Sequence, residues 1–166
     1  MSDVNVEQLA DRVQRLEDIE AIKRVIVRYA QGADKRNDPD IMVPLFAENG
    51  VWDGGDRFGV YQGHDALRNF FAETGSFINW TLHYMVSPAV DISVNSGKAD
   101  AFWYLWETAV MPEQETEKDV ACWIGGTYEA KLSRQSDAKW KFDRVLLNVQ
   151  LLAPYEKGWA ERQVQE

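Results

Sequence analysis

The sequence predicts an α+β domain in which N-terminal helices pack on one face of an antiparallel sheet. Three observations lead to this fold class. Apolar residues recur with helical spacing from Val6 to about Lys35. After Gly75 the spacing changes to strand-like alternation, which is clearest at residues 90–94. The long strand patterns of this second half are separated by short turns, and short turns join antiparallel strands.

Composition narrows the class of function. The chain has 166 residues, enough for one domain with a sizeable core. Its 27 acidic and 18 basic residues give a net charge of -9, and no cluster of Lys and Arg indicates nucleic-acid binding. No apolar run approaches a membrane span, and the first residues lack a signal peptide's apolar core. The single cysteine, Cys122, excludes an internal disulfide, so we expect a cytoplasmic protein without a membrane partner.

The first helix is expected to carry two apolar stripes that differ in phase. The first comprises Val6, Leu9, Val13 and Leu16, and the second comprises Ile19, Ile22, Ile26, Tyr29 and Ala33. The shift predicts either a short arm followed by a core helix or a kink near Glu17–Asp18. Such an arm is too short to be stable alone, so we expect it to pack on the body or on a neighbouring subunit.

The remaining elements follow from turn residues and alternation. Asp38 is placed to cap a short helix over 40–46, with Pro39 at its first position. A hairpin is expected from 51–52 and 59–61, and a third helix over 63–73. Strands are expected at 81–85, 90–94, 99–111, 120–134 and 139–152, with turns at 95–98 and 135–138 and an acidic loop at 112–119. Gly125–Gly126 predicts a bulge or a close backbone approach inside a strand.

The strand over 99–111 is apolar on both faces. Trp103 and Leu105 lie on one face, and Tyr104 and Trp106 lie on the other. A partner subunit would cover the second face, so we expect a homo-oligomer. Glu107 shares the face of Trp103. Burial there would raise the pKa of Glu107, whereas a position at the sheet rim would leave its carboxylate in water.

The last strand is expected to place two amides among leucines. Val145, Leu147, Val149 and Leu151 are assigned to one apolar face, and Asn148 and Gln150 to the other. If these amides are buried, they need hydrogen-bond partners, which a ligand, ordered water or neighbouring backbone can supply.

The chain has two histidines, His64 and His83. His83 shares a strand face with Thr81 and Met85, either as a general base, because imidazole titrates near neutral pH, or as an ordinary core or rim residue. His64 opens a helix and is expected to be exposed. Two scattered histidines and no cysteine pair predict no metal site, and serine-hydrolase and phosphate-loop signatures are absent from the sequence.

Six short motifs, taken together, resemble SnoaL-like members of the nuclear transport factor 2-like superfamily. They are Tyr29-x-x-x-x-Asp34-Lys35-Arg36, Leu45-Phe46-Ala47-Glu48-Asn49 leading to Trp52, Tyr61-x-Gly63, Leu82-His83-Tyr84, Ile124-Gly125-Gly126-Thr127-Tyr128 and Trp140-Lys141-Phe142. The resemblance covers about 18–155 and implies one SnoaL-like domain over 1–166, with a helical arm at about 4–17 and a tail at about 157–166. It also implies a cone-shaped, curved antiparallel sheet around a deep pocket, in a group where trimers are common.

Within this superfamily the chain looks similar to bile acid 7α-dehydratases and hexachlorocyclohexane dehydrochlorinases. This resemblance implies an Asp34–His83 catalytic dyad, with Tyr29 as a third catalytic residue. Glu107 matches a further acidic residue of the dehydratases. Their arginine late in the last strand has no counterpart here, where Asn148, Val149 and Gln150 stand, and this departure affects substrate recognition.

Helix geometry sets a condition on this site. Tyr29 and Asp34 are five residues apart, and an ideal helix turns such residues about 140° from one another. Their side chains therefore converge only if the pocket straddles the helix or the helix loosens at Gly32.

The implied reaction is β-elimination without a cofactor or a metal. We expect a dehydratase acting on a flat apolar polycyclic substrate, a hydroxysteroid such as a 7-hydroxy-3-oxo-4-ene bile acid. Candidate substrate-binding residues are Glu107, Asn148, Gln150, Trp52, Tyr61 and Trp103. A dehydrohalogenase, a ketosteroid-type isomerase and a non-catalytic small-molecule binding module remain as alternatives.

Overall fold

The computed structural model describes residues 5–93, 96–112 and 118–158 of the chain. The first half holds α1 (Val6–Asp34), α2 (Pro39–Met42), the 3₁₀ turn η1 (Val43–Leu45), β1 (Phe46–Asp53), α3 (Gly55–Phe58), β2 (Val60–Gln62) and α4 (His64–Phe77). The second half holds β3 (Trp80–Ser93), β4 (Lys98–Pro112), β5 (Asp119–Arg134), β6 (Trp140–Pro154) and the 3₁₀ turn η2 (Tyr155–Lys157).

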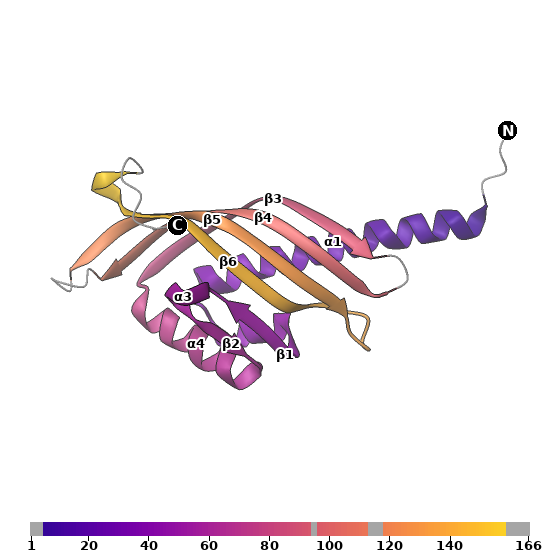
Figure 1. Ribbon diagram of the computed structural model, residues 1–166, viewed down its shortest axis with the longest axis horizontal. Helices are drawn as coiled ribbons and strands as arrows, with labels where there is room; N and C mark the ends of the chain where they lie inside the picture. Colours follow the sequence, from indigo (N-terminus) through magenta and orange to yellow (C-terminus); the bar gives the residue numbers. More distant parts are fainter. Residues whose placement is uncertain (1–4, 94–95, 113–117, 159–166) are drawn as a thin grey trace.

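The strands form one curved sheet with the order β2-β1-β6-β5-β4-β3. The helices lie together on its inner side, next to the end formed by β1 and β2, as Figure 1 shows. The predicted α+β fold is thereby confirmed. One pairing differs from the expected antiparallel sheet, because β1 runs parallel to β6. No tight turn joins these two strands, so nothing in the local sequence dictates their relative direction.

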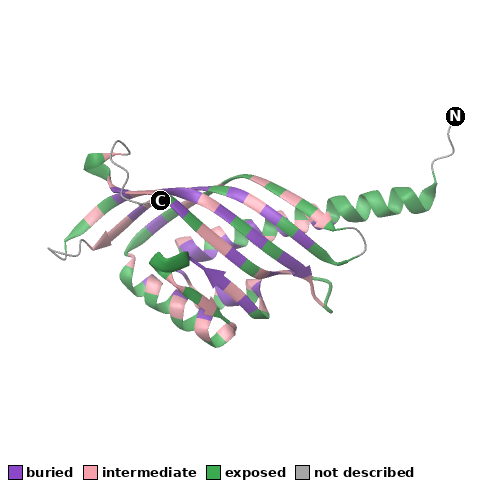
Figure 2. Cartoon of the chain, viewed as in Figure 1, coloured by how far each residue is buried: buried purple, intermediate pink, exposed green. Residues whose placement is uncertain are grey.

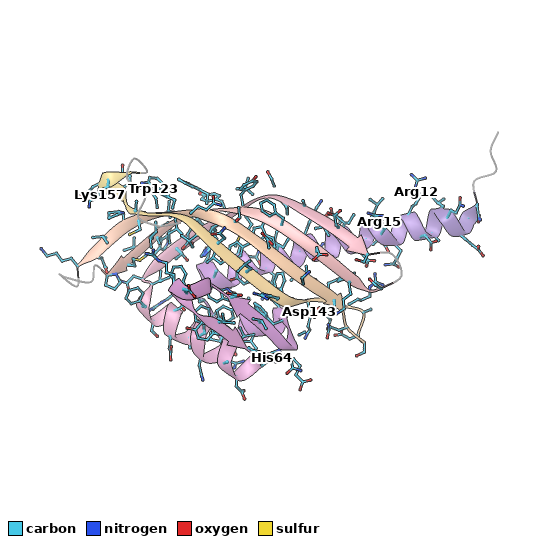
Figure 3. All side chains as sticks on the ribbon, in the orientation of Figure 1. Arg12, Arg15, His64, Trp123, Asp143 and Lys157 are labelled. Carbon is cyan, nitrogen blue, oxygen red and sulfur yellow. The ribbon has the colours of Figure 1, made fainter. Side chains whose placement is uncertain are left out.

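Helix α1 is one continuous helix through Glu17–Asp18. The Asn5 side chain accepts a hydrogen bond from the Glu7 backbone N–H and caps its start. The stripe Val6, Leu9, Val13 and Leu16 is exposed, whereas Ile22, Ile26, Tyr29 and Ala33 are core residues. The apolar stripe of the arm therefore does not pack on the body, and packing on a neighbouring subunit stays a prediction. The first turns of α1 project beyond the sheet and are exposed in Figure 2, and Figure 3 shows Arg12 and Arg15 on this projection.

A buried carboxylate anchors α1 where the helix meets the sheet. Asp18 accepts a hydrogen bond from Trp140 Nε1 at 3.0 Å and forms an ion pair with Arg134. Asp18 lies 122 residues before Trp140 in the chain, so this contact fixes the position of α1 across the sheet. Burial of a charge is tolerated here because the carboxylate is both paired and hydrogen-bonded.

The predicted turn and hairpin of the first half are confirmed. Asp38 accepts a hydrogen bond from the Asp40 backbone N–H, with Pro39 at the start of α2. β1 and β2 pair antiparallel, with Trp52 opposite Tyr61. The hairpin loop contains the short helix α3, and Asp53 at its base forms an ion pair with Arg144 of β6.

Irregularities in strand pairing affect which side chains face the helices. β3 is one long strand whose pairing with β4 shifts between Val86 and Ala89. In β5, Gly125 pairs with Leu151 but Gly126 pairs with Val149, so Gln150 is an extra residue. This confirms the predicted bulge at Gly125–Gly126. It also reverses the alternation after Gln150, so the assignment of Leu151 to the face of Val149 was wrong.

Residues 94–95, 113–117 and 159–166 are not described, so parts of the predicted turn at 95–98, of the acidic loop at 112–119 and of the tail from about 157 lie outside the described residues. Within the described parts of the chain, no helix combines the length and the hydropathy needed to cross a bilayer.

The bulge makes a prediction about stability. A Cβ on Gly126 would collide with the Asn148 carbonyl oxygen, whereas a Cβ on Gly125 would meet its nearest neighbours at 3.4 to 3.5 Å. Gly126→Ala should therefore lower the free energy of unfolding by about 1–3 kcal/mol, measured by urea denaturation. Gly125→Ala is the matched control and should change it little. Equal losses in both variants would show that the bulge does not require glycine at 126.

Candidate active site

One carboxylate oxygen connects the end of α1 to the first part of β3. Asp34 is the last residue of α1, and its Oδ1 lies 2.8 Å from the His83 backbone N and 2.8 Å from His83 Nδ1. Next to this contact, Thr81 Oγ1 donates a hydrogen bond to the Ala33 carbonyl oxygen at 3.3 Å. The structure therefore brings Asp34 and His83 into direct contact across 49 residues of chain.

The local sequence explains why α1 ends at this point. The Lys35 and Asp38 backbone N–H groups both donate to the Gly32 carbonyl oxygen and close the helix. Gly32 also permits close packing, since a Cβ there would lie 2.6 Å from the Met42 sulfur. The last turn of α1 is thus held between α2 and β3.

Glu107 is a buried carboxyl group on the opposite side of the imidazole. It pairs with His83 in the β3–β4 register, is 5% exposed, and its Oε2 lies 3.3 Å from His83 Nε2. Burial raises the pKa of Glu107; His83 acts against this rise, and the charge of Asp34 adds to it. The alternative of a solvated position at the sheet rim was wrong.

The two carboxyl groups do not form a metal site with the histidine. Asp34 lies at Nδ1 and Glu107 at Nε2, on opposite edges of one ring. Among the described residues, no group of three His, Cys, Asp or Glu side chains is arranged to hold an ion. The polar cluster is therefore suited to proton transfer and hydrogen bonding.

Tyr29 is buried one and a half turns before Asp34 and contacts a different part of the interior. Its hydroxyl oxygen accepts a hydrogen bond from Trp52 Nε1 at 2.8 Å. Burial raises the pKa of Tyr29 to about 12, and the hydrogen bonds with Trp52 and Tyr128 oppose this rise. Because α1 continues through Gly32, a loosening of the helix there does not turn Tyr29 toward Asp34.

Tyr128 was not among the predicted site residues. It is buried and stacks on Trp103, with ring centroids 5.1 Å apart. Burial raises its pKa well above the ordinary tyrosine value, and the charges of Tyr29 and Glu107 add to the rise. Alternation along the strand could have indicated that Tyr128 faces the interior, because Tyr128 pairs with the inward-facing Trp103.

Trp52, Trp103 and Tyr61 also lie on the inner side of the sheet. Trp103 is fully buried and donates from Nε1 to the Met85 sulfur at 3.1 Å. Tyr61 is half-buried and stacks on Phe70 at 4.2 Å. These rings form an apolar surround for the polar cluster.

The structure does not bring Asn148 and Gln150 to His83. Both are exposed; Asn148 pairs with Thr127 on the outer face, and Gln150 is the extra residue of the bulge. Asn148 lines a separate hollow of about 270 Å³ beside Phe58. His83, Asp34 and Tyr29 do not line this hollow or the hollows beside Ala101, Trp140 and Leu45.

The second histidine lies outside this cluster. His64 opens α4 as predicted, but it is half-buried rather than exposed, and its Nε2 lies 3.1 Å from the Phe46 carbonyl oxygen. Figure 3 shows the position of His64 at the start of α4, where it contacts β1.

This fold and its inward-facing polar cluster define a family. The model of the SnoaL-like domain family matches residues 14–145, and the chain belongs to that family. No curated protein matches the sequence.

Solved structures of the same fold include enzymes. The hexachlorocyclohexane dehydrochlorinase type 3 of Novosphingobium barchaimii LL02 is similar with a TM-score of 0.76 at 17% identity, over 93% of this chain and 99% of that chain. A protein of Novosphingobium aromaticivorans provisionally assigned as a scytalone dehydratase has a TM-score of 0.72 at 21% identity, over 92% and 97%. Another from that organism, provisionally assigned as an aromatic ring hydroxylase, has a TM-score of 0.73 at 24% identity, over 86% and 96%. At these identities the likeness is one of fold.

The buried state of Glu107 makes a prediction about pH. Its pKa is raised in the folded protein, so the folded state holds this proton above the pH at which the unfolded chain releases it. Stability should therefore fall as pH rises from the unfolded pKa through the folded one, by up to about 1.4 kcal/mol per pH unit for one group. Glu107→Gln should flatten this dependence, measured by urea denaturation between pH 4 and about pH 9.

The exposed Glu129 provides a matched control. Glu129→Gln should leave the pH dependence of unfolding as in the parent protein. A Glu107→Gln variant with the parent's pH dependence would contradict a raised pKa at this position.

Proposed function

We propose that this protein is a cofactor-independent lyase that catalyses β-elimination, most specifically a dehydratase of a hydroxylated polycyclic ketone such as a 7-hydroxy-3-oxo-4-ene bile acid. The observation that carries the proposal is the Asp34–His83 hydrogen bond inside the fold. A histidine whose ring is oriented by a carboxylate is a recurrent general base in enzymes.

The dyad assigns a role to each nitrogen of His83. Asp34 accepts the Nδ1 proton and thereby leaves Nε2 as the nitrogen that takes a proton from carbon. As His83 becomes an imidazolium, the Asp34 carboxylate stabilises the new charge. Glu107 lies at Nε2 in the resting site, so the substrate must enter between these two groups. When it is protonated, Glu107 can donate a hydrogen bond to a substrate oxygen.

The elimination balances without an external oxidant or a metal. In a 3-oxo-4-ene steroid the conjugated ketone makes the C6 proton acidic. Nε2 of His83 takes that proton, and the C–H electron pair enters the dienolate. When the dienolate collapses, a C6–C7 double bond forms and the C7–O bond breaks. The departing hydroxyl takes a proton from the His83 imidazolium and leaves as water, which restores the neutral base, and Tyr29 can hydrogen-bond either to this hydroxyl or to the ketone oxygen.

The aromatic residues of the inner side suit a flat apolar substrate. Trp52, Trp103 and Tyr61 are buried or half-buried around the polar cluster, and apolar walls with a few polar groups are usual in small-molecule sites. Trp80 is exposed on the outer face of the sheet, so it does not belong to this set.

Dehydrohalogenation is the second candidate. It needs the same base, and the similar dehydrochlorinase structure favours it. A ketosteroid-type isomerase would also use this base. A non-catalytic binding module is the weaker alternative, because an apolar binding cavity does not require a charged dyad that must be desolvated.

The outer face of the sheet supports a homo-oligomer. Trp80, Tyr84 and Tyr104 lie on β3 and β4 and are 49%, 50% and 53% exposed, beside Leu82 and Val86. A continuous apolar surface of this kind marks an interaction site. We propose a second copy as the partner and a trimer as the assembly, following the family resemblance.

Substitution of the dyad tests the proposed chemistry. Purified protein is mixed with 7α- and 7β-hydroxy-3-oxo-4-ene steroids, and the red-shifted absorbance of the 4,6-diene ketone is recorded. His83→Ala and Asp34→Asn should each lower kcat by roughly 10²–10⁴-fold, because each removes the oriented base. His64→Gln is the matched control and should retain activity. Turnover that survives in His83→Ala would contradict the general-base role of His83. If the parent protein shows no turnover, these steroids are not its substrates.

Charged substitutions on the outer face of the sheet test whether this face forms the interface of an oligomer. Tyr84→Glu combined with Tyr104→Lys should convert the assembly to monomers, measured by light scattering after size-exclusion chromatography, because charged groups would be desolvated in the interface. Val60→Lys, at another exposed apolar position on β2, is the control and should leave the mass unchanged. A parent protein that is monomeric at all concentrations would contradict the proposal.

A further inference from the structure

We propose that Trp52 is a positioning residue for Tyr29. Its indole N–H donates a hydrogen bond to the Tyr29 hydroxyl oxygen, so that the hydroxyl proton of Tyr29 is directed to an oxygen atom of the bound substrate. The direction of this proton toward a substrate rests on the proposed function. The coupling of Trp52 to Tyr29 does not depend on which reaction the protein catalyses.

The donor and acceptor of this hydrogen bond are unambiguous. An indole N–H can only donate, whereas a phenol oxygen can accept and also donates one proton. Trp52 Nε1 lies 2.8 Å from Tyr29 Oη, and both side chains are buried. Tyr29 is therefore the acceptor, and its own proton remains available to another partner.

The indole is held in one position by its neighbours. Its ring packs on Phe70 with centroids 4.3 Å apart and on Tyr61 at 6.2 Å. The backbone of Gly54 approaches it so closely that a Cβ there would lie 2.7 Å from the indole ring. Such contacts restrict rotation of Trp52, so its N–H direction is preorganised.

The Tyr29 ring is fixed in the same way. It makes edge contacts with Tyr128 at 5.8 Å and with Phe142 at 5.9 Å between ring centroids. With the ring fixed, the remaining freedom of Tyr29 is rotation of its hydroxyl group. An incoming hydrogen bond restricts this rotation because it selects the lone pair that faces the donor.

Tyr128 also affects the Tyr29 hydroxyl. The hydrogen bond between the two tyrosines lowers the pKa of Tyr29 and raises that of Tyr128. The hydrogen bond that Trp52 donates polarises the O–H bond of Tyr29 and strengthens it as a donor. Tyr29 stays neutral at ordinary pH, since its pKa is raised to about 12. Its function in a site is therefore donation.

The first test removes the N–H and keeps the shape. Trp52 is replaced by β-(3-benzothienyl)alanine, in which sulfur stands in place of the N–H, and Tyr29 is replaced by the more acidic 3-fluorotyrosine. The ¹⁹F signal is then titrated with pH in the resting protein. Loss of a hydrogen bond to the phenolate should raise the pKa of the fluorotyrosine by about one unit. The same replacement at the exposed Trp80 is the control and should leave it unchanged. An unchanged pKa in the Trp52 variant would overturn the inference, whatever the activity.

The second test measures turnover in the steroid assay. The Trp52 replacement should lower kcat roughly tenfold with little change in KM, because the oriented donor matters most when charge develops on oxygen. In a Tyr29→Phe background the same replacement should cause no further loss. A full further loss there would show a merely structural role and would also overturn the inference.

The two failures are distinguishable. A parent protein without turnover contradicts the proposed function, while the ¹⁹F titration still decides whether Trp52 acts on Tyr29. Turnover that is independent of Trp52, in a protein whose fluorotyrosine pKa does not shift, contradicts the inference alone.

Discussion

A single carboxylate oxygen lies within hydrogen-bonding distance of two nitrogen atoms of one residue and joins the first helix to the sheet. Asp34 Oδ1 holds both the backbone and the ring of His83, so it joins the first helix to an edge strand and fixes the imidazole at the same time. A histidine ring held at its backbone and at Nδ1 has little rotational freedom. The anchor at Asp18 fixes α1 at a second point on the sheet, which keeps Asp34 in place.

The interior contains two polar groups of residues in an aromatic surround. One comprises Asp34, His83 and Glu107, and the other comprises Tyr29, Trp52 and Tyr128. They are electrostatically linked, because the charge of Glu107 raises the pKa of both tyrosines. The first group can take a proton from carbon and the second can donate to oxygen. Elimination requires both capacities on neighbouring atoms of a substrate.

Periodicity in the sequence predicted the helices, the strands and the inner face of β4, because side-chain direction follows local geometry. The bulge at Gln150 was different. Gly125–Gly126 indicated it, but which strand carried the extra residue depends on pairing, and this decided the face of Leu151. The parallel β1–β6 pairing and the Trp52–Tyr29 hydrogen bond are tertiary contacts with no local signature. Asp34 and His83 were predicted by resemblance, because nothing in helix or strand spacing could place them 2.8 Å apart.

The most direct test of this account is the position of the proton on His83. In uniformly ¹⁵N-labelled protein at neutral pH, long-range ¹H–¹⁵N correlation distinguishes the two imidazole tautomers, and His64→Gln assigns the signals. The account predicts a neutral His83 ring that carries its proton on Nδ1, donated to Asp34, with Nε2 unprotonated. A ring that carries the proton on Nε2 would contradict it, because the nitrogen assigned to proton abstraction would then be unable to accept one.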